Sequence, residues 1–243
     1  MTKLDHLKEI TESKKPFIIY KSDEGFDLFT NFSKKIILTN KNIQNFINNV
    51  SKNKPKRKDT DLFIGFFGYE ILNNLIGVKI KKQNAIKFPK GIFYKPEKRI
   101  KLSTRLNYKP IKPIKFNKNF KVNLNQDSYS NIFKKFKKKI KSGETYQIKI
   151  CTKYKNATQI DALDFFCRLT KTNIAPEAFM IKDKNYSIIS CSPENLITKK
   201  NNFITTKPIA GTLKKTKKLN KAKALSFFKK NIKETKEHNM IVD

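Results

Sequence analysis

The clearest hydrophobic pattern in the sequence begins after residue 123. Apolar side chains recur there at the spacing of one helical face, with lysines filling the opposite face: Tyr129, Ile132, Phe133, Phe136 and Ile140. Asp127 stands at a suitable N-cap position, and Ser142-Gly143 provides the stop that is typical of a helix C-terminus. The pattern therefore predicts an amphipathic helix between Asp127 and Ser142.

The following segment, residues 144–154, alternates with a period of two. Tyr146, Ile148 and Ile150 share one face, and Gln147 lies on the other. This alternation predicts a strand of an antiparallel sheet that is packed on one side only. Gln147 is expected to point away from the apolar face.

The rest of the second half predicts further helices and several short strands. Helices are expected at 161–171, 221–230 and 231–243, and strands at 178–182, 186–190, 196–198 and 203–206. Asp183–Asn185 and Asn201-Asn202 are tight-turn sequences between these strands. Strands joined by such short turns form an antiparallel meander rather than βαβ units, so the predicted fold class is α+β.

The first half carries shorter signals. They predict a helix at 42–50, an exposed charged loop at 51–61, and extended structure in the proline-containing stretch 84–122. The most apolar run, Leu62–Leu72, predicts a buried strand in which Gly65 and Gly68 allow close backbone approach. We place a boundary after residue 122, which gives an N-terminal α+β region (1–122) and a second region (123–243).

The charge balance raises the question of nucleic-acid binding. The 243 residues include 54 basic and 20 acidic side chains, for a net charge of +34, but only four of the basic residues are arginine. Because the lysines are scattered along the chain, we interpret them as a solvated surface that attracts polyanions weakly. A basic nucleic-acid-binding protein is the distant alternative, and it predicts lysines on one face with exposed aromatics. Burial of five phenylalanines would argue against it: Phe63, Phe66, Phe67, Phe133 and Phe136.

Several other classes are disfavoured. No apolar run reaches the roughly 18 residues of a membrane span. The N-terminus lacks the apolar core of a secretory signal, so the expected location is the cytoplasm. Cys151, Cys167 and Cys191 are an odd and widely spaced set, which disfavours both a disulfide framework and a zinc site.

Four segments, in order along the chain, resemble one enzyme family. They are Phe63-Ile-Gly-Phe-Phe-Gly-Tyr-Glu70; Gly143-Glu-Thr-Tyr-Gln-Ile148; Ser190-Cys-Ser-Pro-Glu194 with Lys207-Pro-Ile-Ala-Gly-Thr212; and Lys233-Glu-Thr-Lys-Glu-His-Asn-Met-Ile-Val-Asp243. Each motif alone is weakly specific. Together, at compatible spacing, they are similar to component I of the chorismate-utilising synthases, which include anthranilate, aminodeoxychorismate and isochorismate synthases.

The resemblance runs from about residue 60 to the end and has several implications. It implies two antiparallel sheets flanked by helices, with residues 123–243 as the first half of the chorismate-binding domain. It implies a cytoplasmic, Mg²⁺-dependent enzyme that acts on chorismate with ammonia from a glutamine amidotransferase subunit, component II. The chain stops inside an apolar run, so we interpret it as a fragment. It is predicted to be inactive by itself, because the family's C-terminal half supplies a further metal-binding glutamate and substrate contacts.

The resemblance assigns the catalytic acid to Glu194. Replacement of the ring hydroxyl of chorismate requires protonation of a poor leaving group, a task for a positioned carboxylic acid. In the family the glutamate of the Ser-Pro-Glu motif has this role, and here Pro193 fixes the backbone just before it. An isolated Pro-Glu pair is more often a surface feature, so the assignment depends on the whole set of motifs.

The resemblance assigns a magnesium ligand to Glu237. Mg²⁺ prefers carboxylate oxygens and keeps water and substrate oxygens in its shell. From the residues alone, an i,i+4 pair of Lys233 with Glu237 on a solvated helix is the simpler interpretation, and only the family pattern favours a metal ligand. Glu234 is expected to support the ion without binding it. We expect Glu194 and Glu237 to converge on one cavity.

Gly211 and Thr212 resemble the family's grip on a substrate carboxylate, in which a backbone N–H and a hydroxyl meet the anion. The family usually continues with an arginine, whereas Leu213 and two lysines follow here. Lysine keeps the charge but lacks the planar fork of arginine, so these lysines are assigned no role.

Gln147 and Ala210 are assigned to the wall of the substrate pocket and bear on the reaction. Isochorismate synthases have a lysine base in place of Gln147, and glutamine cannot deprotonate water. Many aminodeoxychorismate synthases have a lysine nucleophile in place of Ala210, whereas the alanine resembles anthranilate synthases. Anthranilate synthase, which aminates and then eliminates pyruvate, is therefore favoured, and aminodeoxychorismate synthase is the alternative. Against the first, residues 17–22 lack the Leu-Leu-Glu-Ser segment used in tryptophan feedback.

Overall fold

The computed structural model describes residues 7, 9–10, 13–52, 59–78, 88–106, 116–173 and 175–242. The chain divides into two compact units, one formed by residues 1–108 with 162–243 and the other by residues 109–161. The boundary placed after residue 122 falls inside the second unit, and the main sheet draws strands from both sides of it.

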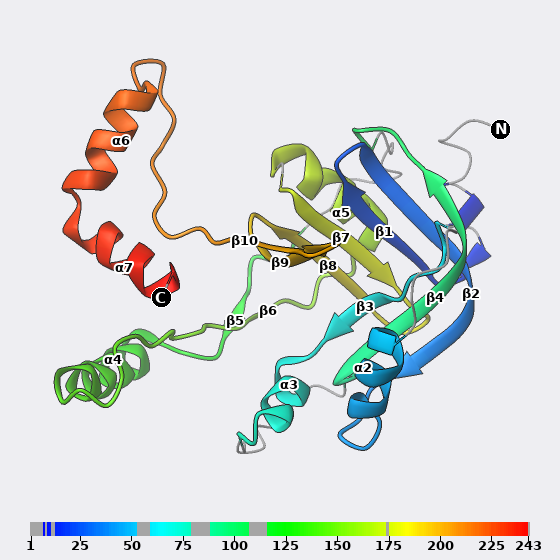
Figure 1. Cartoon of the computed structure of the whole chain (residues 1–243), viewed down its shortest axis with the longest axis horizontal. Coiled ribbons are helices and arrows are strands. Elements are labelled where there is room, and N and C mark those ends of the chain that lie inside the picture. Colours follow the sequence, from blue (N-terminus) through cyan, green and yellow to red (C-terminus); the bar gives the residue numbers. More distant parts are fainter. Residues whose placement is uncertain are drawn as a thin grey trace. The chain divides into compact units, whose positions relative to one another are not determined.

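Helices and antiparallel strands alternate irregularly along the chain (Figure 1). The strands are β1 (Phe17–Ser22), β2 (Gly25–Ile37), β3 (Ile64–Phe67), β4 (Gly91–Lys101), β5 (Lys121–Val122), β6 (Tyr154–Lys155), β7 (Glu177–Lys182), β8 (Ser187–Ser192), β9 (Asn195–Lys200) and β10 (Phe203–Lys207). The helices are α2 (Ile43–Lys52), α3 (Tyr69–Leu75), α4 (Gln126–Lys141), α5 (Ala162–Thr172), α6 (Lys221–Lys230) and α7 (Ile232–Val242). The predicted α+β class with antiparallel sheets is confirmed.

The centre of the first unit is a six-stranded antiparallel sheet in the order β3-β4-β2-β1-β7-β8. β1 lies in its interior, where Ile18 is opposite Phe29 of β2 and Ile181 of β7. A strand with partners on both sides and cover on both faces is shielded from solvent, and the first three residues of β1 are buried while its last three are half-buried. The sheet therefore joins the start of the chain to a hairpin some 160 residues later.

Two separate cores cover the two faces of the sheet. On one face α5 contributes Leu163 and Phe166, which pack with Ile19, Leu28 and Met180. The opposite face carries a second cluster of five fully buried residues with partly buried neighbours: Ile18, Phe29, Ile92, Tyr94 and Ile181. This second face also carries the cavity described below.

The C-terminal part of the first unit follows β8 directly. The predicted strands at 196–198 and 203–206 are confirmed as β9 and β10, which form a two-stranded sheet of their own rather than continuing the six-stranded one. Asn201 in their turn has a left-handed φ of 55°, as expected of asparagine in a tight hairpin. The chain then runs without regular structure to α6 and α7, coloured orange and red (Figure 1).

The second unit is built around α4, and two details differ from the prediction. The N-cap is Asn125, whose Oδ1 accepts from the Ser128 N–H at 2.9 Å, and Asp127 lies in the first turn instead. The prediction of a strand at 144–154 is wrong, because within this segment only Tyr154 pairs with another strand, as part of β6 (Tyr154–Lys155) against β5. Alternation favours an extended backbone, but a strand also requires a neighbouring backbone to bond with.

The run Leu62–Leu72 also differs from the buried strand that was predicted. β3 has four half-buried or exposed residues at the edge of the sheet, and Tyr69 already begins α3. The expected close approach is confirmed at Gly65, where an added Cβ would overlap the carbonyl oxygen of Ile92. The apolar character of this run therefore serves the packing of an edge strand and a short helix.

None of the five phenylalanines used as a burial criterion is fully buried. Phe63, Phe66 and Phe136 are half-buried, whereas Phe67 is 39% exposed and Phe133, on the lysine-rich α4, is 47% exposed. Aromatic burial therefore does not separate an enzyme from a nucleic-acid-binding protein here, and the distinction depends on the site and on the comparisons below.

Candidate active site

The turn that carries Glu194 joins the six-stranded sheet to the β9–β10 hairpin. Ser192 ends β8 and Asn195 begins β9, so only Pro193 and Glu194 lie between the two strands. The Ser192 hydroxyl accepts from the Glu194 N–H at 3.2 Å and donates to the Glu194 carbonyl at 3.1 Å. Such local side-chain bonds replace the ladder bonds that the backbone loses at the turn.

The Glu194 carboxylate is exposed and reaches the next predicted motif. Its Oε1 accepts a hydrogen bond of 2.8 Å from the backbone N–H of Ile209, in the segment Lys207–Thr212. The contact joins two motifs that are 15 residues apart in the sequence. Within that segment Ala210 and Gly211 are half-buried and Thr212 is exposed.

Gly211 lies against the side chain of Glu234 near the start of α7. A Cβ added at Gly211 would overlap the Glu234 carboxylate, so glycine is what allows the two segments to meet. Glu234 Oε2 is buried and has no hydrogen-bond partner among the described residues. Because Ile209 and Gly211 are two residues apart, the segment spans at most about 7 Å between its contacts with Glu194 and Glu234.

Glu237 lies one helical turn after Glu234 and is half-buried. Residues three apart on a helix are neighbours on its surface, so the two carboxylates belong to one stripe of α7. The structure thus brings the Ser190–Glu194 segment, the Lys207–Thr212 segment and α7 together through Ile209 and Gly211.

A cavity of about 580 Å³ opens beside Glu194 on the second face of the sheet. Its walls are mainly apolar, and none of its described lining residues is a lysine, although the chain is strongly basic. Glu194 lines it together with Leu62 and Phe63, which directly precede β3, and with residues from β1, β2, β3, β4, β7, β8 and β9: Ile18, Tyr20, Ser22, Asp27, Phe29, Ile64, Gly65, Arg99, Glu177, Phe179, Ile181, Ser192, Asn195 and Leu196. Ala210, Gly211, Thr212 and Glu237 are not among the described lining residues. Glu194 and Glu237 are therefore linked through the 209–211 segment, and their convergence on one cavity stays a prediction.

Two pairs of polar side chains in this cavity are hydrogen-bonded to each other. Arg99 donates to Asp27 at 2.8 Å, and this bond with the carboxylate raises the pKa of the guanidinium despite its partial burial. Tyr20 donates to Glu177 at 2.8 Å, and burial followed by this bond raises the pKa of the phenol to about 12. The Arg99 guanidinium therefore stays charged and the Tyr20 phenol stays protonated across the physiological range.

Two residues of the cavity, Glu177 and Asn195, had not been singled out in the sequence. Asn195 Nδ2 donates to Glu177 Oε1 at 2.9 Å, so the residue after Glu194 is tied to the first residue of β7. The two residues are 18 positions apart, a separation that matches no sequence motif. They meet only because β7 pairs with β8. No local pattern would have identified them.

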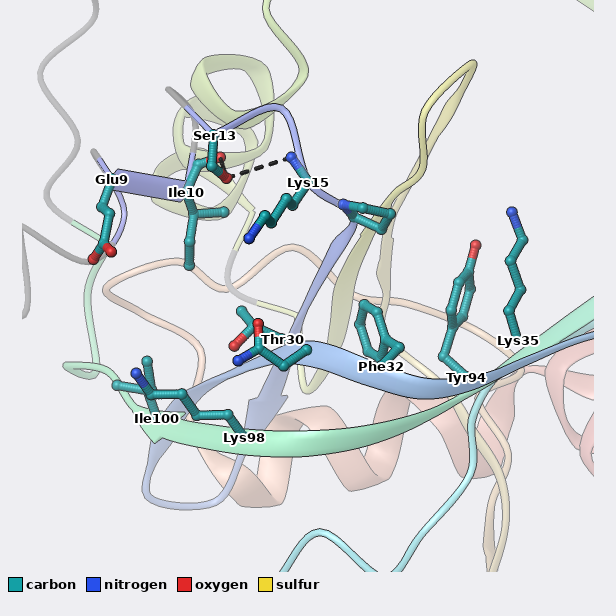
Figure 2. Close-up of a pocket in the computed structure, with 12 residues that line it drawn as sticks. Glu9, Ile10, Ser13, Lys15, Thr30, Phe32, Lys35, Tyr94, Lys98 and Ile100 are labelled. Carbon is teal, nitrogen blue, oxygen red and sulfur yellow. Dashed lines mark hydrogen bonds between the residues drawn. The ribbon is translucent and has the colours of Figure 1, made fainter.

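A second hollow, of about 450 Å³, has a different character (Figure 2). Its described lining includes Lys15, Lys35 and Lys98 but no residue of the predicted site. The side chains of Lys35 and Tyr94 stand next to each other in this view, and both donate to Asp183 Oδ2, at 2.6 Å and 2.8 Å. These bonds anchor the turn of the β7–β8 hairpin to β2 and β4.

Gln147 belongs to the second unit, where its side chain is exposed and its backbone is outside any strand. Among the residues that the structure describes, no three histidine, cysteine, aspartate or glutamate side chains are grouped so as to hold a metal ion. No helix in the described ranges has the length and apolarity that a membrane crossing requires.

Comparison with known proteins places the chain in a family. The model of the chorismate binding enzymes matches residues 10–243. The chain belongs to this family of chorismate-binding enzymes. The nucleic-acid alternative is therefore not needed to explain the sequence.

Individual relatives of this chorismate-binding enzyme carry two names. The chain is 28% identical over 233 residues to anthranilate synthase component 1 of Buchnera aphidicola subsp. Pemphigus spyrothecae, and the match covers 78% of the chain and 44% of the relative. It is 30% identical over 125 residues to aminodeoxychorismate synthase component 1 of Bacillus subtilis (strain 168), covering 51% and 27%.

The fold has a solved counterpart in anthranilate synthase component I from Streptococcus pneumoniae TIGR4. The superposition has a TM-score of 0.66 at 20% identity and covers 93% of the chain but 57% of that protein. The chain therefore spans between about a quarter and somewhat more than half of the lengths of these relatives.

Proposed function

We propose that the protein is component I of a synthase that adds ammonia to chorismate with loss of the ring hydroxyl. The observation that carries the proposal is the 2.8 Å hydrogen bond between Glu194 Oε1 and the Ile209 N–H. It sets the proposed acid beside the segment proposed to bind the substrate. Oε2 of Glu194 is left to hold the proton that the departing hydroxyl receives as it leaves as water.

The substrate carboxylate is proposed to meet the backbone N–H of Gly211 and the hydroxyl of Thr212. Thr212 is exposed and Gly211 has no side chain of its own, which favours close approach of an anion to its backbone. Because the Glu234 carboxylate fills the space where a Cβ would stand, the substrate carboxylate is proposed to approach Gly211 from its N–H side. Gln147 and Ala210 are proposed as parts of the pocket wall, where neither offers a base or a nucleophile. Ammonia then attacks the ring directly.

Glu237 is proposed as a ligand of Mg²⁺, with Glu234 beside it. The donor set fits this ion, because Glu237 offers one carboxylate and leaves the remaining positions to water and substrate oxygens, while Glu234 Oε2, one turn away, is buried without a hydrogen-bond partner among the described residues. When bound, the ion supplies positive charge against the substrate's ring carboxylate.

The product is proposed to be anthranilate, with aminodeoxychorismate as the alternative. Ala210 in place of a lysine favours the first, and both names occur among the relatives. Since those relatives are named as component 1, ammonia is proposed to come from a separate glutamine amidotransferase subunit. We also propose a cytoplasmic location, and that the 243 residues alone do not turn over chorismate, since they span only 44% and 57% of the compared chains.

The test is an assay of the complete polypeptide that the gene encodes, with chorismate, ammonium and Mg²⁺. Fluorescent anthranilate supports the first product, and a non-fluorescent amine that a lyase converts to 4-aminobenzoate supports the second. Glu194→Gln is expected to lower kcat by about 10²–10⁴-fold, because the leaving hydroxyl loses its acid, with an unchanged unfolding midpoint. Normal turnover by this variant would show that Glu194 is not the acid. If neither product forms with the wild type, the proposed reaction is refuted.

A further inference from the structure

Glu177 joins three elements beside the turn that carries Glu194. It is the first residue of β7, and its ladder partner is Ser192, the last residue of β8. Its Oε2 accepts from the Tyr20 hydroxyl of β1 at 2.8 Å, and its Oε1 accepts from Asn195 Nδ2 of β9 at 2.9 Å. One carboxylate therefore bridges β1, β7 and β9.

These contacts fix both ends of the Ser192–Asn195 turn. Ser192 is paired through the sheet, and Asn195 is held through its side chain. Glu194 lies between them and directs its carboxylate to the Ile209 N–H. Because each residue spans at most about 3.6 Å, a displacement of Asn195 is passed directly to Glu194.

We propose that Glu177 is a positioning residue, which holds the Ser192–Asn195 turn so that the Glu194 carboxylate faces the Ile209 N–H. The functional meaning of this geometry rests on the proposed role of Glu194 as the acid. The geometry itself is independent of that role.

The direction of every hydrogen bond in this network is defined. Burial, and then the bond to Glu177, raise the pKa of Tyr20 to about 12, so the phenol remains a donor. Asn195 Oδ1 accepts from the Thr198 hydroxyl at 3.0 Å, which orients the amide with its NH₂ group toward Glu177. Two donors thus meet two acceptor oxygens, and a glutamine at 177 would turn an NH₂ group toward one of them.

The chain contains a matched control at the other end of the same hairpin. Asp183 follows β7 and also accepts from a tyrosine hydroxyl, that of Tyr94, and from a second side chain, Lys35. Asp183→Asn therefore disturbs a comparable network on the same hairpin without touching the Ser192–Asn195 turn. A residue that merely stabilises the sheet would behave like Asp183.

The experiment follows the backbone amide of Ile209 by NMR in the full chain, without substrate, between pH 3 and 7. This amide is bonded to Glu194, so its chemical shift reports the ionisation of that carboxylate, and Glu194→Gln identifies the signal by removing the titration. Glu177→Gln is expected to abolish the pH-dependent shift of Ile209. Asp183→Asn is expected to leave it as in the wild type, apart from any shift at the β7–β8 turn.

Asn195→Ala provides a second variant, because it releases the turn while Glu177 keeps its bond to Tyr20. The proposal is overturned if both variants retain the wild-type titration, if Asp183→Asn abolishes it equally, or if Glu194→Gln shows that Ile209 does not report Glu194. In the turnover assay, Glu177→Gln should lower kcat by about 10- to 100-fold with little change in KM. Normal turnover by Glu194→Gln would refute the proposed acid while leaving the NMR result on positioning intact.

Discussion

The six-stranded sheet and the β9–β10 hairpin are built from similar strand sequences, yet their burial is opposite. In β1, Phe17, Ile18 and Ile19 are at most 3% exposed, whereas Leu196 and Phe203 of the hairpin are 86% and 77% exposed. β1 has ladder partners on both sides and covered faces, while β9 and β10 have only each other within the described part of the chain. Local pattern produces a strand, but burial depends on the layers that surround it.

The residues that stabilise the fold therefore differ from the residues of the candidate site. The buried core of the sheet provides most of the folding free energy, whereas Glu194 and most of the 207–212 segment are exposed and held by few hydrogen bonds. Substitutions in the two regions should therefore differ in kind. The sheet should respond in stability, and the motif segments in ligand binding and turnover.

The largest expected effect is at Phe166 of α5, which is fully buried and meets Phe26 edge to face at a centroid distance of 6.0 Å. Phe166→Ala should lower the free energy of unfolding by about 3–5 kcal/mol, because it leaves a cavity under the sheet. Ile204→Ala in the 65%-exposed position of β10 should change it by no more than about 0.5 kcal/mol. Urea unfolding of both variants measures the contrast, and equal losses would contradict it.

An intermediate effect is expected at Asp183, whose carboxylate anchors the β7–β8 turn. Burial alone would raise its pKa, but bonds from Lys35, the Lys184 N–H and Tyr94 lower it below the usual 3.8. Asp183→Asn should therefore reduce stability by about 2 kcal/mol at neutral pH. Since the folded pKa is depressed, the wild type loses this contribution as the pH falls below 3.8 and through the folded pKa.

The unfolding midpoints of wild type and Asp183→Asn should accordingly converge at acidic pH. Thermal unfolding followed from pH 7 to pH 2.5 tests this convergence. A constant difference over the whole range would show that the carboxylate charge does not contribute.

The smallest effect on stability is expected at Gly211, and Gly65 provides a contrasting glycine at which the effect should be larger. A Cβ at Gly211 meets only the end of the flexible Glu234 side chain, so Gly211→Ala should change stability by no more than about 0.5 kcal/mol. A Cβ at Gly65 meets the backbone of Ile92 and Phe93, so Gly65→Ala should cost about 1–3 kcal/mol.

For Mg²⁺ affinity, the order of the two glycine variants should be the reverse of their order in stability. Displacement of the Glu234 carboxylate by Gly211→Ala should weaken Mg²⁺ binding about tenfold, whereas Gly65→Ala should not weaken it. Calorimetric titration of Mg²⁺ into the complete polypeptide measures this. An unchanged affinity in Gly211→Ala would place the ion away from Glu234.

Most element positions followed from the sequence, because helices and hairpins depend on nearby residues. The amphipathic pattern of α4 and the Asn201-Asn202 turn were both predicted. The exceptions have identifiable causes. Asn125 and Asp127 are both good caps, and the choice between them depends on one side-chain bond to Ser128. Residues 144–154 alternate like a strand but lack a pairing partner along most of their length.

The sequence by itself determined the class of the protein, since the four ordered motifs already indicated the chorismate-binding family that residues 10–243 match. It also determined Glu194 and Glu237 as the residues to test. Only the tertiary structure decided that β1 pairs with β7, that Glu194 meets the Ile209 N–H, and that Glu177 reaches Tyr20 and Asn195. Those contacts join residues far apart in the chain, and their geometry is fixed by sheet register and packing, which no local propensity encodes.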